Sequence, residues 1–253
     1  MELVWGLYVF TCGLILGSFY HVAGLRLPKK QSMLWPRSHC SSCKKTLKAI
    51  DLFPVLSYLL LKGKCRHCSQ RISYTYPLVE LVTAMLFLGA WLAFGWSWNF
   101  AVSLLLISML MIIIVSDLAY MLIPDKVLLS FAAAVLLLRI SVHPLDPWWS
   151  ALAGGAAGFL LLFMIAVLSK GGMGGGDIKL FGVLGLFFGV QEVILVFFLS
   201  VLFGALFGML GWLAGKVKKG VPFAFGPYIA IASMIALFFG SDMIDWYIYL
   251  SGK

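Results

Sequence analysis

The chain has 253 residues, of which 62% are hydrophobic and only 11% are charged, against about 45–50% and 25% in ordinary soluble domains. This composition excludes a conventional water-soluble globule, because 19 basic and 10 acidic residues cannot cover its surface. The mean hydropathy of +1.01 agrees with a protein whose solvent is the lipid bilayer.

The formal net charge of +9 is concentrated in one segment of the chain. Eleven of the 19 basic residues lie between Arg26 and Arg71, where Asp51 is the only acidic residue. An excess of basic charge can indicate nucleic-acid binding, but here it interrupts a hydrophobic chain. The distribution predicts a polar basic lobe at a membrane surface and no nucleic-acid partner.

Apolar runs of about 17–25 residues are long enough to cross a bilayer as helices. Seven runs qualify: Val4–Gly24, Leu78–Trp98, Phe100–Ser116, Val127–Val142, Trp149–Leu168, Ile194–Gly215 and Phe223–Phe239. An eighth run, Ile178–Val190, fits either a re-entrant segment or a short span. The first run follows Glu2 rather than a basic region and precedes basic residues, so it predicts a retained span rather than a signal peptide.

The positive-inside rule orients these runs. If the basic segment is cytosolic and all eight runs cross, further basic residues also face the cytosol: Lys126, Lys170, Lys216, Lys218 and Lys219. The opposite face then receives Glu2, Asp146, Glu192, Asp242 and Asp245. Without the eighth run, the cluster at Lys216 to Lys219 would lie outside, so charge favours eight spans with both termini outside the cytosol.

The expected fold is therefore an all-α polytopic membrane protein of about eight transmembrane helices, with a small cytosolic zinc-ribbon-like lobe after the first helix. We expect three parts: a first helix at 1–25, the basic lobe at 26–76, and a transmembrane domain at 77–253. Within the lobe, Leu52 to Leu61 is apolar but too short to cross. It is expected at the membrane interface or beneath the lobe.

Four of the five cysteines form two Cys-x-x-Cys pairs, Cys40 with Cys43 and Cys65 with Cys68. Two such pairs supply four thiolates to a tetrahedral ion, and a lobe this small needs more than apolar burial to hold together. A reducing cytosol disfavours disulfides. The pattern predicts structural zinc, while a redox-active pair and unligated thiols remain alternatives.

The remaining cysteine and the two histidines beside the Cys-x-x-Cys pairs have simpler interpretations. His39 and His67 adjoin the cysteines and could replace one as a ligand, but both are interpreted as polar loop residues. Cys12, inside the first run, is expected to be a packing residue.

Two aspartates stand out, because ionisable groups in or at the ends of membrane spans are costly and therefore functional candidates. Asp117 ends the third run, and Asp177 opens the short run after Gly171-Gly172-Met173-Gly174-Gly175-Gly176. The assigned topology puts both at the cytosolic edge. The glycines would allow close backbone approach by another chain and φ values closed to other residues.

Simpler roles compete for each carboxylate. Asp177 could be a helix cap stabilised by the helix dipole, whereas a phosphate loop lacks both a preceding strand and the Walker Lys-Ser/Thr pair. Asp125, after Pro124, competes with Asp117, but a cap of the next helix is favoured for it. Glu80 is either a dipole-stabilised end residue or a polar contact for the lobe.

Two carboxylates that share a site cannot both ionise cheaply, so one keeps a proton while the other stays charged. Such a pair can hydrolyse a peptide bond. The ionised member takes a proton from water as the water attacks the scissile carbonyl, and the protonated member donates to the carbonyl oxygen.

The ordered motifs of the chain resemble those of the type IV prepilin peptidases, a family of aspartic membrane enzymes that share a Gly-x-Gly-Asp element with other intramembrane proteases. The resemblance runs nearly end to end. It includes Gly17-Ser18-Phe19, residues 36–43 and 63–68 around the cysteines, residues 72–80 through Glu80, the stretch from Asp117 to Asp125, residues 172–180 around Asp177, and Phe225-Gly226-Pro227.

This resemblance implies that Asp117 and Asp177 are the catalytic aspartates of a bacterial inner-membrane enzyme whose active site faces the cytosol. It implies prepilin or pseudopilin substrates with a short basic leader, a glycine before the cut and a hydrophobic helix after it. It further implies methylation of the new N-terminus with S-adenosylmethionine, served by the lobe. The basic face of the lobe is expected to meet anionic lipid headgroups rather than the leader.

Two other classes of protein fit the sequence less well. A membrane transporter with functional acidic residues and a zinc-binding regulatory lobe is the main alternative, but coupling carboxylates usually lie near the bilayer midplane. A zinc-dependent enzyme needs an open metal position, which four thiolates would close.

Overall fold

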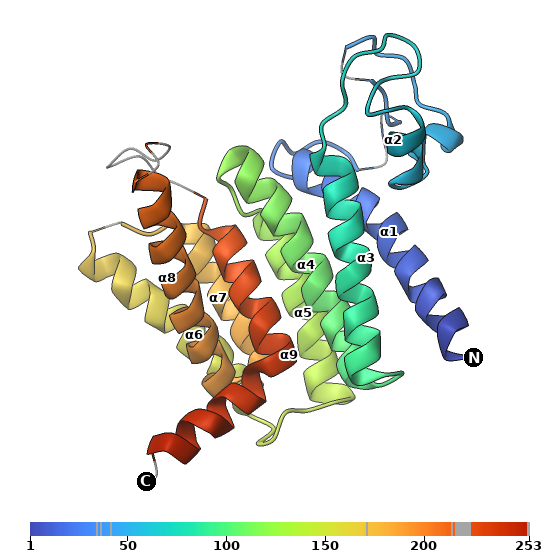
Figure 1. Cartoon of the computed structure of the whole chain (residues 1–253). Helices are drawn as coiled ribbons and strands as arrows, with labels where there is room; N and C mark the ends of the chain where they lie inside the picture. Colours follow the sequence, from blue (N-terminus) through green and yellow to red (C-terminus); the bar gives the residue numbers. More distant parts are fainter. Residues whose placement is uncertain are drawn as a thin grey trace. The chain divides into compact units, whose positions relative to one another are not determined.

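A computed structural model of the chain describes residues 1–33, 35, 37–40, 42–170, 172–213, 215 and 224–251. Several residues named above lie outside the described residues: Pro36, Ser41, Gly171, Lys216, Lys218, Lys219 and Phe223. The chain divides into two compact units, residues 1–100 and 101–253. Figure 1 shows the helices that make up each unit.

Each of the eight apolar runs corresponds to a long helix in the described part of the chain. These helices are α1 (Glu2–Arg26), α3 (Thr75–Phe94), α4 (Trp98–Tyr120), α5 (Asp125–Ser141), α6 (Ser150–Leu168), α7 (Gly175–Phe188), α8 (Val190–Leu213) and α9 (Gly226–Ser251). The lobe adds the short helices η1 (Ala49–Leu52) and α2 (Leu56–Leu60), and the described residues contain no strand. The all-helical fold with a lobe after the first helix is confirmed.

Six of the eight helices are long and apolar enough to cross a membrane: α1, α3, α4, α6, α8 and α9. The other two are shorter, with 17 residues in α5 and 14 in α7. Gly95 and Gly189 both have a positive φ, and each ends a helix within a continuous apolar stretch. The apolar run that was expected to reach Trp98 therefore stops at Phe94, and only Gly189 separates α7 from α8.

In the first unit, α1 packs against α3 through small residues. A Cβ on Gly13 would lie 2.6 Å from the Cα of Ala84, and a Cβ on Gly17 would lie 2.8 Å from the Cα of Glu80. Glycine at these positions lets the two backbones approach closely, as is common between membrane helices. The Gly17-Ser18-Phe19 motif thus lies at a helix contact.

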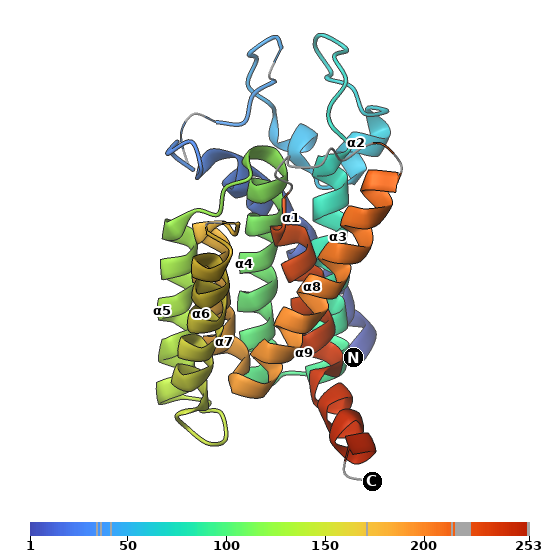
Figure 2. The same ribbon diagram turned by 90° about the vertical axis from the view of Figure 1, so that its left-hand side faces the viewer.

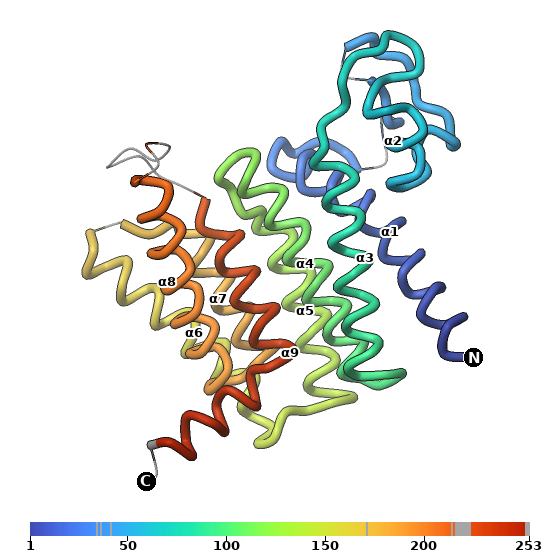
Figure 3. The backbone as a smooth tube through the Cα atoms, in the orientation of Figure 1, coloured from blue at the N-terminus to red at the C-terminus, as the bar shows by residue number. Residues whose placement is uncertain are grey.

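In the second unit, α7 is held between α5 and α6, and Figure 2 shows these helices from the side. Asp125 and Lys179 pair at the start of α5 and α7, and Arg139 Nη2 donates to the Phe187 carbonyl near the end of both, at 2.6 Å. The two helices therefore run parallel. Within this unit, the tube in Figure 3 reverses direction at each link from α4 to α9.

The contact between α6 and α7 is the closest in this unit. A Cβ added to Gly185 would overlap the carbonyl of Gly154, and a Cβ on Gly154 would lie 2.5 Å from the Gly185 oxygen. Gly158 is likewise set against the backbone of Phe181. This glycine contact fixes the helix that carries Asp177.

Candidate active site and metal centre

A cavity of about 400 Å³ lies where α4 ends and where α5 and α7 begin. Its lining residues come from these helix ends and the links beside them: Asp117, Met121, Leu122, Ile123, Asp125, Gly174, Gly175, Gly176, Asp177 and Lys179. The structure thus brings together both aspartates that the sequence singled out, and their competitor Asp125 with them. All of the lining residues belong to the second unit.

Asp117 lies in the last turn of α4 and is only 6% exposed. The backbone N–H of Gly226, at the start of α9, donates to Asp117 Oδ2 at 2.7 Å. The turn after α4 is tied back to the helix, because Met121 N–H donates to the Asp117 carbonyl at 2.8 Å and the Ser116 hydroxyl donates to the Leu122 carbonyl. The carboxylate is therefore held in one orientation at the cavity wall.

Asp177 is the third residue of α7 and is half-buried. The residue that caps this helix is Gly174, so Asp177 is not the cap. Its carboxylate lies toward the glycines, since a Cβ on Gly174 would be 3.1 Å from Asp177 Oδ2. Both carboxylates line the same cavity, so a charge on one disfavours a charge on the other.

The described glycines before Asp177 leave space for close packing and do not adopt unusual φ values. None of Gly172, Gly174, Gly175 and Gly176 has a positive φ, so that part of the expectation is wrong for these four, while Gly171 lies outside the described residues. A Cβ on Gly176 would lie 3.0 Å from the Ile123 side chain, whereas one on Gly175 would meet no atom within 4 Å. Gly175 therefore leaves bare backbone along the cavity, where an extended peptide could approach.

Asp125 does not cap α5, contrary to the favoured expectation. Pro124 occupies the N-cap position, with no side-chain hydrogen bond to the helix N–H groups. Asp125 is the first helical residue, and its two carboxylate oxygens accept from Lys179 Nζ at 2.8 and 2.9 Å. The ammonium of Lys179 draws the carboxylate away from the helix end.

Lys179 and Gly226 are the two site residues whose roles the sequence reasoning missed. Both stand in motifs that carried the resemblance, Asp177-Ile178-Lys179 and Phe225-Gly226-Pro227. Their partners lie far away in the chain, 54 residues for Lys179 and 109 for Gly226. Position in a motif was the only signal that could have found them.

The four paired cysteines of the first unit form one cluster, in which all four Sγ atoms lie within 4.8 Å of one another. Cys40 Sγ and Cys68 Sγ are 3.7 Å apart, which is too far for a disulfide bond of about 2.05 Å. Four sulfurs at about 2.3 Å from a tetrahedral zinc ion are spaced by about 3.8 Å. The cluster therefore fits a metal such as zinc, with all four positions taken by protein thiolates.

The two cysteine pairs have the same backbone geometry. Lys44 N–H donates to the Cys40 carbonyl at 3.0 Å, and Ser69 N–H donates to the Cys65 carbonyl at 2.9 Å. Lys44 and Ser69 each follow the second cysteine of a pair, and both have a φ of 58°. Two matching turns thus present their thiols to one point.

The thiols of this cluster interact electrostatically. Backbone N–H groups of Cys43 and Ser42 lower the pKa of Cys40 to about 6. The Gln70 N–H acts in the same direction on Cys68, but desolvation and the neighbouring thiols raise the pKa of Cys68 to about 11. A divalent cation would relieve this conflict, because it binds thiolates and displaces their protons.

Glu80 joins the lobe to α3, which resolves its two alternative roles in favour of a polar contact. The side chain is buried, with 6% exposure, and Oε2 accepts from the Val55 N–H at 2.8 Å. Val55 has a φ of 59°, a conformation that β-branched residues rarely adopt. The buried carboxylate holds the turn that precedes α2.

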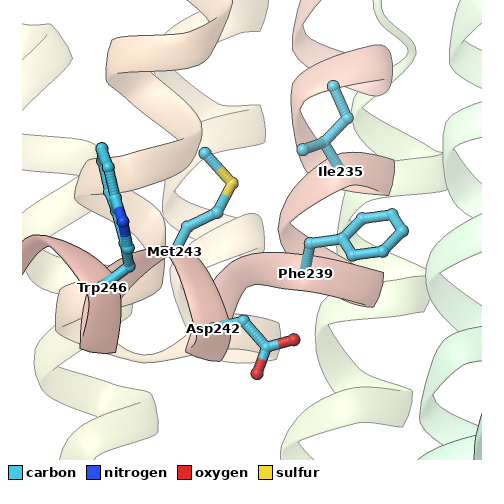
Figure 4. Close-up of a pocket in the computed structure, with 5 residues that line it drawn as sticks. All are labelled: Ile235, Phe239, Asp242, Met243 and Trp246. Carbon is cyan, nitrogen blue, oxygen red and sulfur yellow. The ribbon is translucent and has the colours of Figure 1, made fainter.

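A second cavity, of about 430 Å³, is lined by α9 alone. Figure 4 shows its residues along the later part of that helix: Ile235, Phe239, Asp242, Met243 and Trp246. Gly240 and Ser241 lie within this stretch, and such a pair is a common site of helix bending. The cavity contains one carboxylate and neither Asp117 nor Asp177.

Comparisons with known proteins cover nearly the whole chain. Residues 11–94 match the bacterial Peptidase A24 N-terminal domain, and residues 104–209 match the type IV leader peptidase family. A prepilin leader peptidase/N-methyltransferase of Bacillus subtilis is 46% identical over 96% of this chain and 98% of its own length. Proteins with the same name from Aeromonas salmonicida and Pseudomonas aeruginosa are each 34% identical over 95% of this chain and 92% of their own length. No solved structure matches the chain significantly.

Proposed function

The chain belongs to the type IV leader peptidase family, and from this premise we propose that it cleaves the basic leader from prepilins or pseudopilins with Asp117 and Asp177 as its catalytic pair. It is a multi-pass membrane protein of a protease family. The observation that carries the proposal is the shared cavity, which both carboxylates line beside the bare backbone of Gly175.

The surroundings of the two carboxylates favour different roles for them. A backbone N–H that donates to a carboxylate favours its charged form, and Gly226 donates to Asp117. Two carboxylates that share one cavity cannot both ionise cheaply. We assign the charge to Asp117 as general base and the proton to Asp177 as general acid.

Hydrolysis then proceeds by proton transfers between the pair and the peptide. Asp117 takes a proton from water as the water oxygen bonds to the scissile carbonyl carbon, while Asp177 gives its proton to the carbonyl oxygen. The tetrahedral intermediate collapses as the carbon–nitrogen bond breaks and the proton on Asp117 passes to the leaving amine. The hydroxyl proton of the intermediate returns to Asp177, which restores the pair.

The names of the relatives also give a second activity, N-methylation. We propose that this chain methylates the newly exposed amine with S-adenosylmethionine as methyl donor, and that the lobe at 26–76 serves this step while 77–253 carries the peptidase. No Rossmann-type fingerprint is present in the sequence, so no residue is assigned to the donor.

The sulfur cluster would hold zinc through Cys40, Cys43, Cys65 and Cys68. Four thiolates leave no open position on the ion, so the metal would support the fold of the lobe and would not activate water. Each matching turn would be fixed by two metal bonds.

We place the active site on the cytosolic side of a bacterial inner membrane. Asp117 lies three residues before the end of α4 and Asp177 lies in the first turn of α7, so both are near helix ends. This position favours a peptidase over a transporter, whose coupling carboxylates usually lie near the midplane. Exposed apolar side chains of the lobe, Phe53, Leu56 and Leu60, are suited to the lipid interface beside its lysines.

Co-expression with a prepilin, followed by mass spectrometry of its N-terminus, tests both activities together. Asp117→Asn and Asp177→Asn should each lower cleavage by about 10²–10⁴-fold, the usual contribution of a general acid or base, while the protein still inserts. Asp245→Asn, an exposed carboxylate on α9, is the matched control and should cleave normally. Full activity in either of the first two variants would reject the pair.

A further inference from the structure

An ion pair stands at the rim of the active-site cavity. Lys179 Nζ lies 2.8 and 2.9 Å from the two carboxylate oxygens of Asp125, and both residues line the cavity with Asp117 and Asp177. The side chain of Asp125 is 68% exposed and that of Lys179 is 52% exposed. The pair is therefore open to anything that enters the cavity.

This pair is not needed to hold α5 against α7. Exposed ion pairs contribute little net stability, because water screens them and two flexible side chains must be ordered. At the other end of the same two helices, buried Arg139 donates to the Phe187 carbonyl at 2.6 Å. Asp125 can therefore exchange its partner at small cost to the fold.

The charge balance of the cavity favours a cation as the new partner. Three carboxylates and one ammonium line it, so its net charge stays negative even when one of the aspartates keeps a proton. The chain as a whole carries a net charge of +9. This cavity is thus a locally acidic site in a basic protein.

We propose that Asp125 binds a basic side chain of the substrate leader, which takes the place of Lys179. The inference rests on the proposed function, in which the leader is basic and short. An extended chain advances about 3.3–3.6 Å per residue, and Asp125 lines the same cavity of about 400 Å³ as the catalytic pair, so a leader residue close to the scissile bond is the one placed to meet it. Lys179 keeps Asp125 oriented in the free enzyme and competes with leaders that lack a positive charge.

The test measures cleavage kinetics with two substrates, one with a leader lysine near the cut and one with that lysine replaced by glutamine. Asp125→Asn should raise KM for the lysine leader about five- to tenfold, in the range of an exposed charge-assisted contact, with little change in kcat. It should leave KM for the glutamine leader unchanged. Asp245→Asn, outside the cavity, should alter neither substrate.

The variant Lys179→Gln tests whether the leader lysine displaces Lys179 from Asp125 or whether Lys179 only stabilises the structure. If the leader lysine displaces Lys179, removing the competing ammonium should lower KM for the lysine leader by a few-fold. A rise in KM in this variant would overturn the exchange. Asp125→Lys combined with a leader glutamate should restore part of the lost affinity.

Two further outcomes would overturn the inference without touching the proposed function. One is an equal rise in KM for the lysine and glutamine leaders in the Asp125→Asn enzyme. The other is a wild-type enzyme with the same KM for lysine and glutamine leaders, a measurement that needs no folded variant. Failure of the proposed function is distinct, because it appears as no cleavage of either leader by the wild type, or as normal cleavage by Asp117→Asn.

Discussion

Gly226 sets a backbone N–H against Asp117, and the space there admits no side chain. A Cβ at Gly226 would lie 2.8 Å from Asp117 Oδ2 and 3.2 Å from its Cβ. Either α9 or the carboxylate would have to move, and overpacking of this kind costs about 1–3 kcal/mol. The motif glycine is thus a positioning residue for the proposed base.

We predict that Gly226→Ala lowers kcat by about tenfold or more, because the hydrogen bond to the carboxylate is lengthened or lost. The effect on KM should be smaller, since Gly226 is not among the residues that line the cavity. Gly240→Ala in the same helix is the matched control, because its neighbours would be in ordinary contact at 3.6–3.9 Å. Equal kcat values for the two variants would show that Gly226 does not position Asp117.

At the scale of single residues, the sequence indicated which chemistry to look for but not which contacts support it. Asp117 and Asp177 could be singled out because acidic residues are rare in this chain and costly near a membrane. The hydrogen bond from Gly226 joins residues 109 apart, and no periodicity or spacing reports such a contact. The cap proposed for Asp125 was wrong for the same reason, since Lys179 lies 54 residues away.

Among the helices, α7 is the element on which the site depends. Gly154 and Gly158 of α6 pack against Gly185 and Phe181 of α7 and hold it. Between membrane helices there is no hydrophobic driving force, so close van der Waals packing of small residues carries much of the association. Seven apolar runs and one short run predicted eight helices correctly. Which of these helices pack against one another could not be predicted, because nearly every face of every run is apolar.

We predict that Gly154→Val abolishes cleavage through loss of this packing. The added side chain would overlap the backbone of Gly185 and Gly189, so α7 and Asp177 would be displaced. Ala156→Val, on an exposed part of the same helix, should keep activity. Thermal unfolding in detergent gives the second readout, and a Gly154→Val protein with wild-type stability and activity would contradict the packing.

The basic lobe is the other element whose fold can be tested directly. We predict about one zinc per chain in purified protein, lost in Cys40→Ser or Cys65→Ser. Methylation should fall more than cleavage, because the cavity with Asp117 and Asp177 lies wholly in the second unit. Elemental analysis gives the metal content, and metal-free protein with an intact lobe would count against the zinc centre.

At the scale of the whole molecule, the distribution of lysines along the chain and the directions of the helices predict the same topology. In the second unit the cavity lies at the end of α4 and at the start of α5 and α7. The hydrogen bond from Gly226 brings the start of α9 to the same end. Alternation along the chain then places the end of α6 and the end of α8 there as well. In the sequence, Lys170 follows α6, and Lys216, Lys218 and Lys219, which lie outside the described residues, follow α8. By the positive-inside rule we expect that end to face the cytosol.

We predict that a topology reporter inserted in the loop with Lys216, Lys218 and Lys219, which lies outside the described residues, responds as cytosolic. The short helix α7 decides the outcome, because its 14 residues rise only about 21 Å against a hydrocarbon core of about 30 Å. If α7 crosses, this reporter shares the side of one placed in the lobe, and reporters at Trp96 and at either terminus report the opposite side. If α7 enters and leaves on one face, the lysine loop moves outside while the lobe does not. That result would be compatible with the aspartate pair but would rule out the eight-span topology. Three lysines would then lie outside the cytosol, against the positive-inside rule from which the orientation was inferred.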